Sequence, residues 1–154
     1  MKVLFVCLGN IARSTMAEAL FTQMVADEGL SAQIKIDSAG TSDEERGNPP
    51  HPGTQKVLRE LNVPFDWIHA RQIQVEDFKT ADWIITMDHQ NMATLKQRCP
   101  AQLQTKIHLA YEILPDKQDQ EIPDPWYTQR FDITYQQLME VLPMWLQFFK
   151  NKLA

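Results

Sequence analysis

The sequence V-C-L-G-N-I-A-R-S, residues 6–14, joins an apolar run to an amphipathic pattern and thereby decides the fold. Before it, residues 2–6 (K-V-L-F-V) predict a buried strand. After it, apolar residues recur at helical spacing from Met16 to Val25, so a helix is expected there. A strand, a tight loop and a helix in this order are typical of an α/β fold with a parallel sheet.

The remainder of the chain continues to alternate short β-rich runs with helical patterns. Further strands are expected at residues 33–37, 83–87 and 106–109, and further helices at about 54–62, 89–98 and 132–153. We therefore predict a single-domain α/β fold over residues 1–154. It has a four-stranded parallel sheet, helices on both faces, and a phosphate loop between strand 1 and helix 1.

Several local signals refine this expectation. Residues 40–53 are rich in glycine and proline and predict a loop, while residues 111–129 predict a long irregular stretch of the functional kind. Thr15 and Glu18 have the spacing of a capping box for the first helix. Pro143 falls inside the last predicted helix and is expected to kink it.

Composition excludes several classes of protein. The 154 residues are 44% hydrophobic and carry a net charge of −5, which argues against a nucleic-acid or anionic-membrane partner. No window approaches the length of an apolar membrane span, and the N-terminal apolar run is too short for a signal peptide. Two cysteines make no disulfide framework, so a cytoplasmic location is expected.

The loop of residues 7–13 combines the groups that bind an anion. The backbone N–H groups of Leu8, Gly9, Asn10, Ile11 and Ala12 can turn inward, and the helix N-terminus adds partial positive charge. We expect Gly9 to supply the backbone freedom that the turn needs.

Three side chains of the same segment add the chemistry. Cys7 at the head of the loop predicts a thiolate nucleophile, and Arg13 offers a planar fork that matches phosphate oxygens. Ser14 can donate a hydrogen bond to the sulfur. The alternative is purely structural: Cys7 as a small buried residue, Arg13 as a surface charge and Ser14 as a helix cap.

A candidate general acid lies in the long irregular stretch. Asp124 stands between two prolines and before Trp126 and Tyr127, whose rings are candidates for lining an aryl substrate site. Expelling a phenolate requires a proton, which a carboxylic acid can supply. The alternative is a rigid turn that exposes Asp124 to solvent.

The segment C-L-G-N-I-A-R-S resembles the signature of the low-molecular-weight protein tyrosine phosphatases. Four other segments occur in the order expected of that family: residues 37–42, 70–72, 87–88 and 124–126. The resemblance implies a phosphocysteine on Cys7, with Arg13 binding phosphate and Asp124 acting as general acid and base. It implies no cofactor. The expected partner is a phosphotyrosine-containing protein, with a tyrosine kinase among the candidates, and the expected state is a monomer or weak dimer.

The resemblance also implies supporting residues. Asn10, Ser14 and Ser38 would form a hydrogen-bond network that shapes the loop, although Ser38 also suits a strand-end turn. Asp88 would be a carboxylate behind the site, or equally a helix N-cap.

The chain departs from the family pattern at several positions. The family often shows H-x-A-R, whereas here His69 stands one residue later and is not assigned a role in the network. Residues 43–46 read D-E-E-R where an aromatic wall is usual, so we expect a specificity that favours basic neighbours of the phosphotyrosine. A second loop cysteine is replaced by Ala12, and Ile11 resembles tyrosine-directed rather than arginine-directed members.

Two alternative functions remain open at this point. An arsenate reductase uses a similar loop but needs further cysteines, and Cys99 is the only one left. A catalytically inactive phosphotyrosine-binding module would not need Cys7, Arg13 and Asp124 together. The other histidines lack metal-ligand spacing, and no metal site is predicted: His51, His89 and His108.

Overall fold

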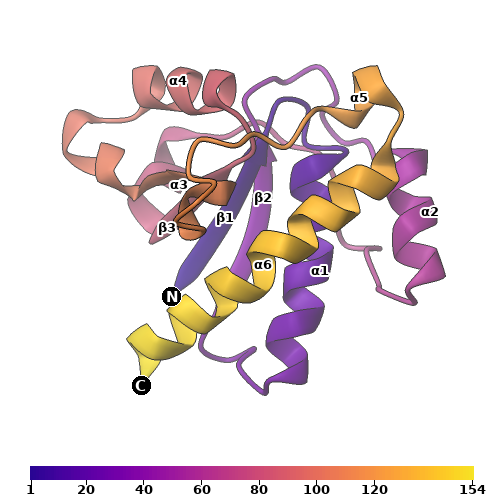
Figure 1. Cartoon of the computed structure of the whole chain (residues 1–154). Coiled ribbons are helices and arrows are strands. Elements are labelled where there is room, and N and C mark those ends of the chain that lie inside the picture. The colour runs from indigo at the N-terminus through magenta and orange to yellow at the C-terminus, as the bar shows by residue number, and fades with distance from the viewer.

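Four parallel strands form the centre of the molecule in the computed structural model, which describes residues 1–154 (Figure 1). Their order across the sheet is β2-β1-β3-β4, and their bounds are β1 Lys2–Cys7, β2 Lys35–Gly40, β3 Trp83–Thr86 and β4 Ile107–Leu109. The expected fold class is confirmed. β2 extends beyond its predicted end at residue 37, because Ser38, Ala39 and Gly40 pair with the last three residues of β1.

Six α-helices connect and cover the strands: α1 Arg13–Asp27, α2 Pro52–Glu60, α3 Val75–Thr80, α4 His89–Arg98, α5 Pro125–Thr128 and α6 Phe131–Leu153. Two short 3₁₀ helices span Ala101–Lys106 and Ala110–Ile113. The sequence patterns missed α3 and the one-turn α5, since helices this short show little periodicity. The stretch 111–129 is therefore not wholly irregular. None of the helices is long and apolar enough to span a membrane.

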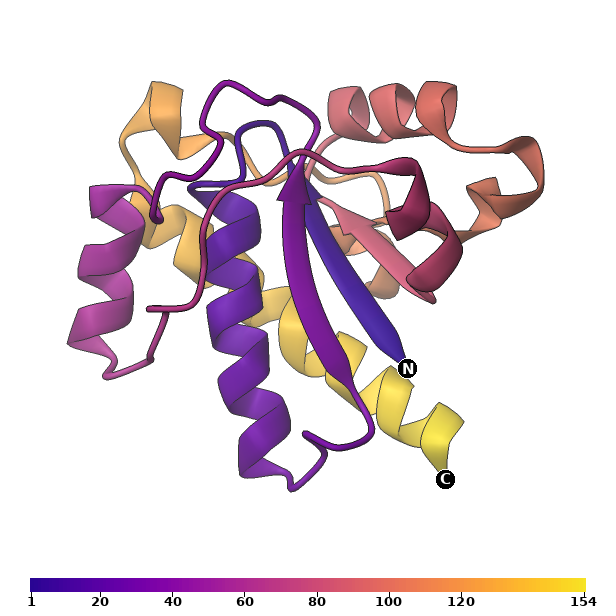
Figure 2. The ribbon, with the colours of Figure 1, turned by 180° about the vertical axis from the view of Figure 1, so that it is seen from behind.

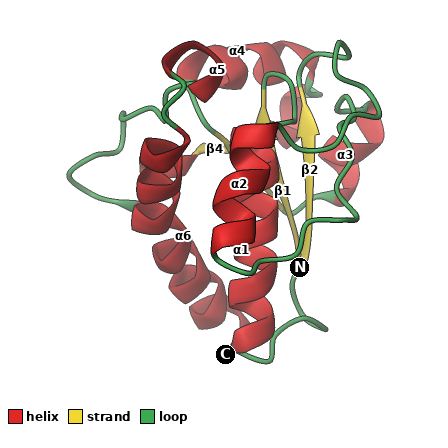
Figure 3. Ribbon diagram, turned by 90° about the vertical axis from the view of Figure 1, so that its right-hand side faces the viewer, coloured by secondary structure: helices red, strands yellow, loops and turns green.

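The side chains of β1 point alternately to the two faces of the sheet, and the core is therefore divided into two layers. Val3, Phe5 and Cys7 belong to the larger apolar cluster, which α1 and α6 complete. Leu4 and Val6 belong to a smaller cluster under α3 and α4. Figure 3 shows α1, α2 and α6 on one side of the strands and α3 on the other. Helices thus cover both faces, as parallel sheets require.

The topology brings the functional loops to one edge of the sheet. β1 pairs with β2 on one side and with β3 on the other. The connection that follows β1 therefore leads to one side of the sheet, and the connection that follows β2 leads to the other. Ligands of open α/β sheets bind at such a switch point. Figure 2 shows the loops after β1 and β2 together at this edge, beside the segment that leads into α5.

The predicted capping box does not form at the start of α1. The helix begins at Arg13 instead, two residues before Thr15, and no side chain caps it. The Thr15 hydroxyl donates to the carbonyl of Ala12, while Glu18 bonds to side chains from other elements. The phosphate loop opens directly into the helix, which leaves its first N–H groups without a capping side chain.

Candidate active site

The backbone of the phosphate loop (Leu8–Ala12) is held by its carbonyl groups. The carbonyl of Leu8 accepts from the N–H of Ser42 at 2.9 Å, and that of Ile11 accepts from His51 at 2.7 Å. In contrast, no N–H of the loop donates to another group of the chain. These N–H groups and the N-terminus of α1 are therefore free to bind an anion.

The left-handed backbone conformation of this loop belongs to Asn10 (φ 57°), not to Gly9 as the sequence suggested. A Cβ on Gly9 would meet only ordinary contacts, with Glu45 at 3.5 Å and Ile11 at 3.8 Å. The glycine that the loop requires is Gly40 at the end of β2, where a Cβ would lie 2.7 Å from the carbonyl oxygen of Leu8. Close approach of two backbones, rather than a turn, demands that glycine.

Arg13 lies beneath the loop with a side chain only 2% exposed. Its Nη1 donates to Asp88 at 2.7 Å and to the carbonyl of Ile122 at 2.9 Å, while Nη2 lies 3.6 Å from Asp124. Its Nε has no partner in the chain. Burial alone would lower the pKa of Arg13, but the charges of Cys7, Asp88 and Asp124 raise it. The guanidinium is thus a fixed cation with a free donor for an anion.

Asp88 fulfils both roles that the sequence left open. One carboxylate oxygen accepts from Arg13, and the other accepts from the N–H of Asn91 as the N-cap of α4. The first turn of α4 and the arginine are therefore fixed to each other.

A chain of buried hydrogen bonds leads away from the Cys7 sulfur. Cys7 Sγ lies 3.0 Å from the hydroxyl of Ser14. The amide nitrogen of Asn10 donates to Ser14 at 2.8 Å and to Ser38 at 2.9 Å. Because Ser14 accepts from Asn10, its own proton is free to point at the sulfur.

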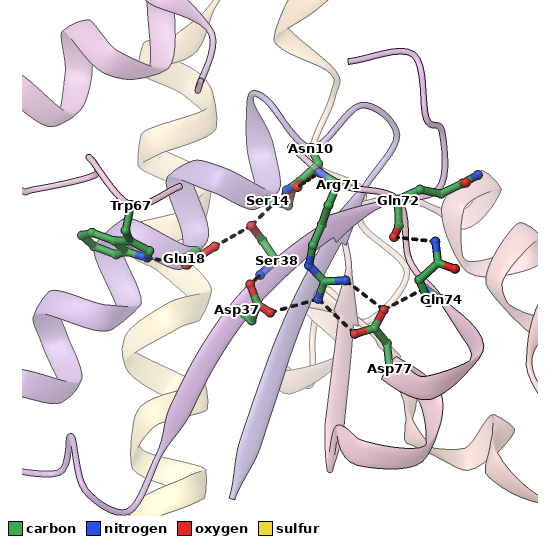
Figure 4. Close-up of polar contacts among 10 residues, drawn as sticks. All are labelled: Asn10, Ser14, Glu18, Asp37, Ser38, Trp67, Arg71, Gln72, Gln74 and Asp77. Atoms are coloured by element: carbon green, nitrogen blue, oxygen red, sulfur yellow. Dashed lines mark hydrogen bonds and ion pairs between the residues drawn. The ribbon is translucent and has the colours of Figure 1, made fainter. Parts of the chain in front are cut away.

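The network extends to two residues that sequence reasoning missed (Figure 4). The hydroxyl of Ser38 donates to Glu18 at 2.6 Å, and the indole N–H of Trp67 donates to the other oxygen of Glu18 at 2.7 Å. Burial raises the pKa of Glu18, although these two hydrogen bonds act in the opposite direction. His69 is exposed, and its ring hydrogen-bonds to the carbonyl of Trp67 rather than to the network around Asn10.

A second support reaches Asn10 from the opposite side. The backbone N–H of Arg71 donates to the side-chain oxygen of Asn10 at 3.0 Å, which fixes the orientation of the amide. The guanidinium of Arg71 is itself held by Asp37 and Asp77, each at 2.9 Å (Figure 4). These partners lie 27 or more residues from Asn10 in sequence, so the local sequence pattern could not show that they support it.

Asp124 approaches the loop from the far end of the chain. Ile122 anchors its segment, since its N–H donates to the carbonyl of Met87 and its carbonyl accepts from Arg13. One oxygen of Asp124 caps α5 by accepting from the N–H of Trp126 at 3.0 Å. The other faces Arg13, and the carboxylate is 20% exposed.

These groups surround one pocket. Its twelve lining residues are Cys7, Leu8, Gly9, Ile11, Ala12, Arg13, Ser42, Glu44, Glu45, Asp124, Trp126 and Tyr127. The side chains of Asn10 and Ser14 do not line it, because they lie fully buried in the network behind the loop. The rings of Trp126 and Tyr127 are 55% and 78% exposed at the mouth. No cluster of three or more His, Cys, Asp or Glu side chains is placed to hold a metal ion.

Comparison with known proteins agrees with this geometry. The family model "Low molecular weight phosphotyrosine protein phosphatase" matches residues 2–154. The low molecular weight protein-tyrosine-phosphatase YfkJ of Bacillus subtilis is 43% identical over 131 residues, covering 85% of this chain and 84% of YfkJ. The crystal structure of YfkJ superposes with a TM-score of 0.95 at 38% identity, covering 99% of this chain and 96% of that one. The structure of DARP, a drosophila arginine phosphatase, superposes with a TM-score of 0.88 at 33% identity, covering 97% and 98%.

Proposed function

The chain belongs to the low molecular weight phosphotyrosine protein phosphatase family, and on this basis we propose that it hydrolyses phosphotyrosine through a covalent phosphocysteine on Cys7. The observation that supports the proposal most is the surroundings of the sulfur. Cys7 lies at the base of a pocket whose loop N–H groups are free, beside a buried Arg13 with an unpaired Nε. Asp124 lines the same pocket.

In the first step, the thiolate of Cys7 attacks phosphorus and forms the S–P bond. The bond from phosphorus to the tyrosine oxygen breaks, and its electron pair passes to that oxygen. The carboxylic acid of Asp124 donates a proton there, so that neutral tyrosine leaves. The loop N–H groups and Arg13 stabilise the charge on the three equatorial oxygens.

In the second step, the carboxylate of Asp124 accepts a proton from a water molecule, whose oxygen attacks phosphorus. The S–P bond breaks and its electrons return to Cys7 as the thiolate. Ser14, at 3.0 Å from the sulfur, donates the hydrogen bond that stabilises this leaving group. Inorganic phosphate is released. We expect the substrate to be a phosphotyrosine-containing protein, with a tyrosine kinase among the candidates, and the enzyme to act as a monomer or weak dimer.

The similarity to DARP makes phosphoarginine a second candidate substrate. Ile11 argues against it, because this apolar side chain lines the pocket and offers no hydrogen bond to a guanidinium. An arsenate reductase is disfavoured, since Cys7 and Cys99 are both free and belong to clusters on different faces of the sheet.

The test compares hydrolysis of p-nitrophenyl phosphate, a phosphotyrosine peptide and the matching phosphoarginine peptide by the purified chain. We expect release of phosphate from the first two and far less from the third. Cys7→Ser should abolish turnover yet bind phosphate, because the loop N–H groups and Arg13 remain. Turnover by Cys7→Ser, or faster hydrolysis of the phosphoarginine peptide, would contradict the proposal.

A further inference from the structure

The mouth of the pocket has two chemically different walls. The acidic wall consists of Glu44 and Glu45, from the loop after β2, and the aromatic wall consists of Trp126 and Tyr127, from α5. Glu45 is half-buried with its Cγ close to Gly9 of the phosphate loop, whereas Glu44 is exposed. The acidic wall therefore stands directly beside the place where an anionic substrate binds.

The carboxylates of the acidic wall have no cationic partner in the chain. None of the ion pairs of the protein includes Glu44 or Glu45, and Glu45 accepts one hydrogen bond, from Asn48 at 2.7 Å. Arg13 is the only basic residue that lines the pocket, and Asp88 already pairs with it. The negative charge at the mouth is therefore left for a ligand to neutralise.

Carboxylates without a cationic partner beside a phosphate site weaken the binding of most phosphorylated substrates. They repel the phosphate dianion and any acidic residue next to it. A substrate that carries a positive charge at the mouth is instead attracted by these carboxylates. The unpaired Nε of Arg13 and the loop N–H groups orient the phosphate toward the pocket base, so the residues that flank the phosphotyrosine lie at the mouth.

On the basis of the proposed function, we propose that the acidic wall selects phosphotyrosine flanked by lysine or arginine. The ammonium or guanidinium of the flanking residue pairs with Glu44 and Glu45. The exposed rings of Trp126 and Tyr127 hold the tyrosine ring and offer a second contact for the cation. The substrate class is thus a basic phosphotyrosine segment.

The test measures kcat/KM for phosphotyrosine peptides of equal length that differ only at the two flanking positions, with lysine, glutamine or glutamate there. Two partly exposed ion pairs are expected to favour the lysine peptide over the glutamine peptide by about three- to tenfold. The glutamate peptide should be slower than both. The preference should shrink as salt rises, because exposed charges are screened over about 10 Å at 0.1 M.

Matched variants assign the effect to the acidic wall. In Glu44→Gln/Glu45→Gln the ratio of kcat/KM for the lysine peptide to that for the glutamine peptide should fall close to one. The amide oxygen at position 45 still accepts from Asn48. The control is Asp43→Asn, which removes one negative charge from the residue next to the acidic wall. Asp43 is exposed but does not line the pocket, so this variant should keep the preference.

The outcomes separate this inference from the proposed function. Equal rates on the three peptides, an unchanged preference in the double variant, or an equal loss in Asp43→Asn would overturn the selection by the acidic wall while phosphatase activity stands. If neither the peptides nor p-nitrophenyl phosphate is hydrolysed, the proposed function fails and the inference falls with it.

Discussion

Replacing Asp124 by asparagine separates its chemical role from its structural one. Asparagine retains a side-chain oxygen that accepts from the N–H of Trp126, so the N-cap of α5 survives. It cannot donate the proton that the leaving phenolate needs. Asp124→Ala removes both functions, and the comparison of the two variants isolates the proton.

The magnitude follows from these two roles. A positioned general acid contributes about 10²- to 10⁴-fold to a rate, or about 3 to 5 kcal/mol in the barrier. We expect Asp124→Asn to lose this much on phosphotyrosine peptides. It should lose clearly less on p-nitrophenyl phosphate, because p-nitrophenolate is a weaker base and leaves more readily without a proton. Asp124→Ala should show similar rates but unfold about 1 kcal/mol more easily, since the cap is lost.

The assay is kcat/KM for a series of aryl phosphates with increasingly basic leaving groups, together with urea unfolding of each variant. For the wild type the dependence on leaving group should be shallow, and for Asp124→Asn it should be steep. A uniform loss across the series, or full activity of Asp124→Asn on phosphotyrosine, would refute the assignment of Asp124 as the proton donor.

Three further predictions concern groups around the site. Trp67→Phe leaves a buried oxygen of Glu18 without its hydrogen bond, so urea unfolding should show a loss of about 1 to 3 kcal/mol; unchanged stability would exclude this contact as a support. Burial acts to raise the pKa of Asp77, but hydrogen bonds from Arg71 and from the backbone N–H of Gln74, together with the charge of Arg71, lower it overall. Its stabilisation is therefore present above about pH 3.9, the unfolded-state pKa, and is lost as pH falls through the lower folded value. Asp77→Asn should accordingly be less stable than wild type at pH 7, and this difference in unfolding free energy should narrow as pH falls below about 3.9; a difference that does not narrow in acid would contradict this. Brief peroxide treatment should add oxygen to Cys7 without forming a Cys7–Cys99 disulfide, because the two thiols lie in clusters on different faces of the sheet; an intact mass lower by two hydrogens would disprove it.

Sequence reasoning predicted the structure where its determinants are local. The strand that ends at Cys7, the helix that begins at Arg13 and the loop between them occupy one short segment. Within such a segment, the allowed backbone conformations and the spacing of apolar residues largely set the geometry. The order of strands and helices followed from the same periodicities, and the expected fold class is confirmed.

The capping box that the local sequence pattern predicted at the start of α1 was wrong. Thr15 and Glu18 have the spacing of a capping box, yet Glu18 accepts from Ser38 and Trp67 instead. A buried carboxylate needs strong donors, and two donors from other elements satisfy it better than a single backbone N–H at the helix end. Likewise, the required glycine is Gly40 rather than Gly9, since a neighbouring strand approaches the loop there.

The sequence by itself predicted the α/β frame, which is confirmed, and the proposed anion-binding loop with Cys7 at its head. The resemblance placed Ser38, Asp88 and Asp124 near this segment, but only the tertiary structure showed which other distant residues support and surround it. Arg71 is hydrogen-bonded to Asn10 across 61 positions of sequence, and Ile122 to Arg13 across 109. The acidic wall, which follows β2, lines the same pocket as the loop. The physical reason is that hydrogen bonds and ion pairs depend on distances of a few ångströms. Between segments far apart in sequence, those distances are set by how helices pack on the sheet.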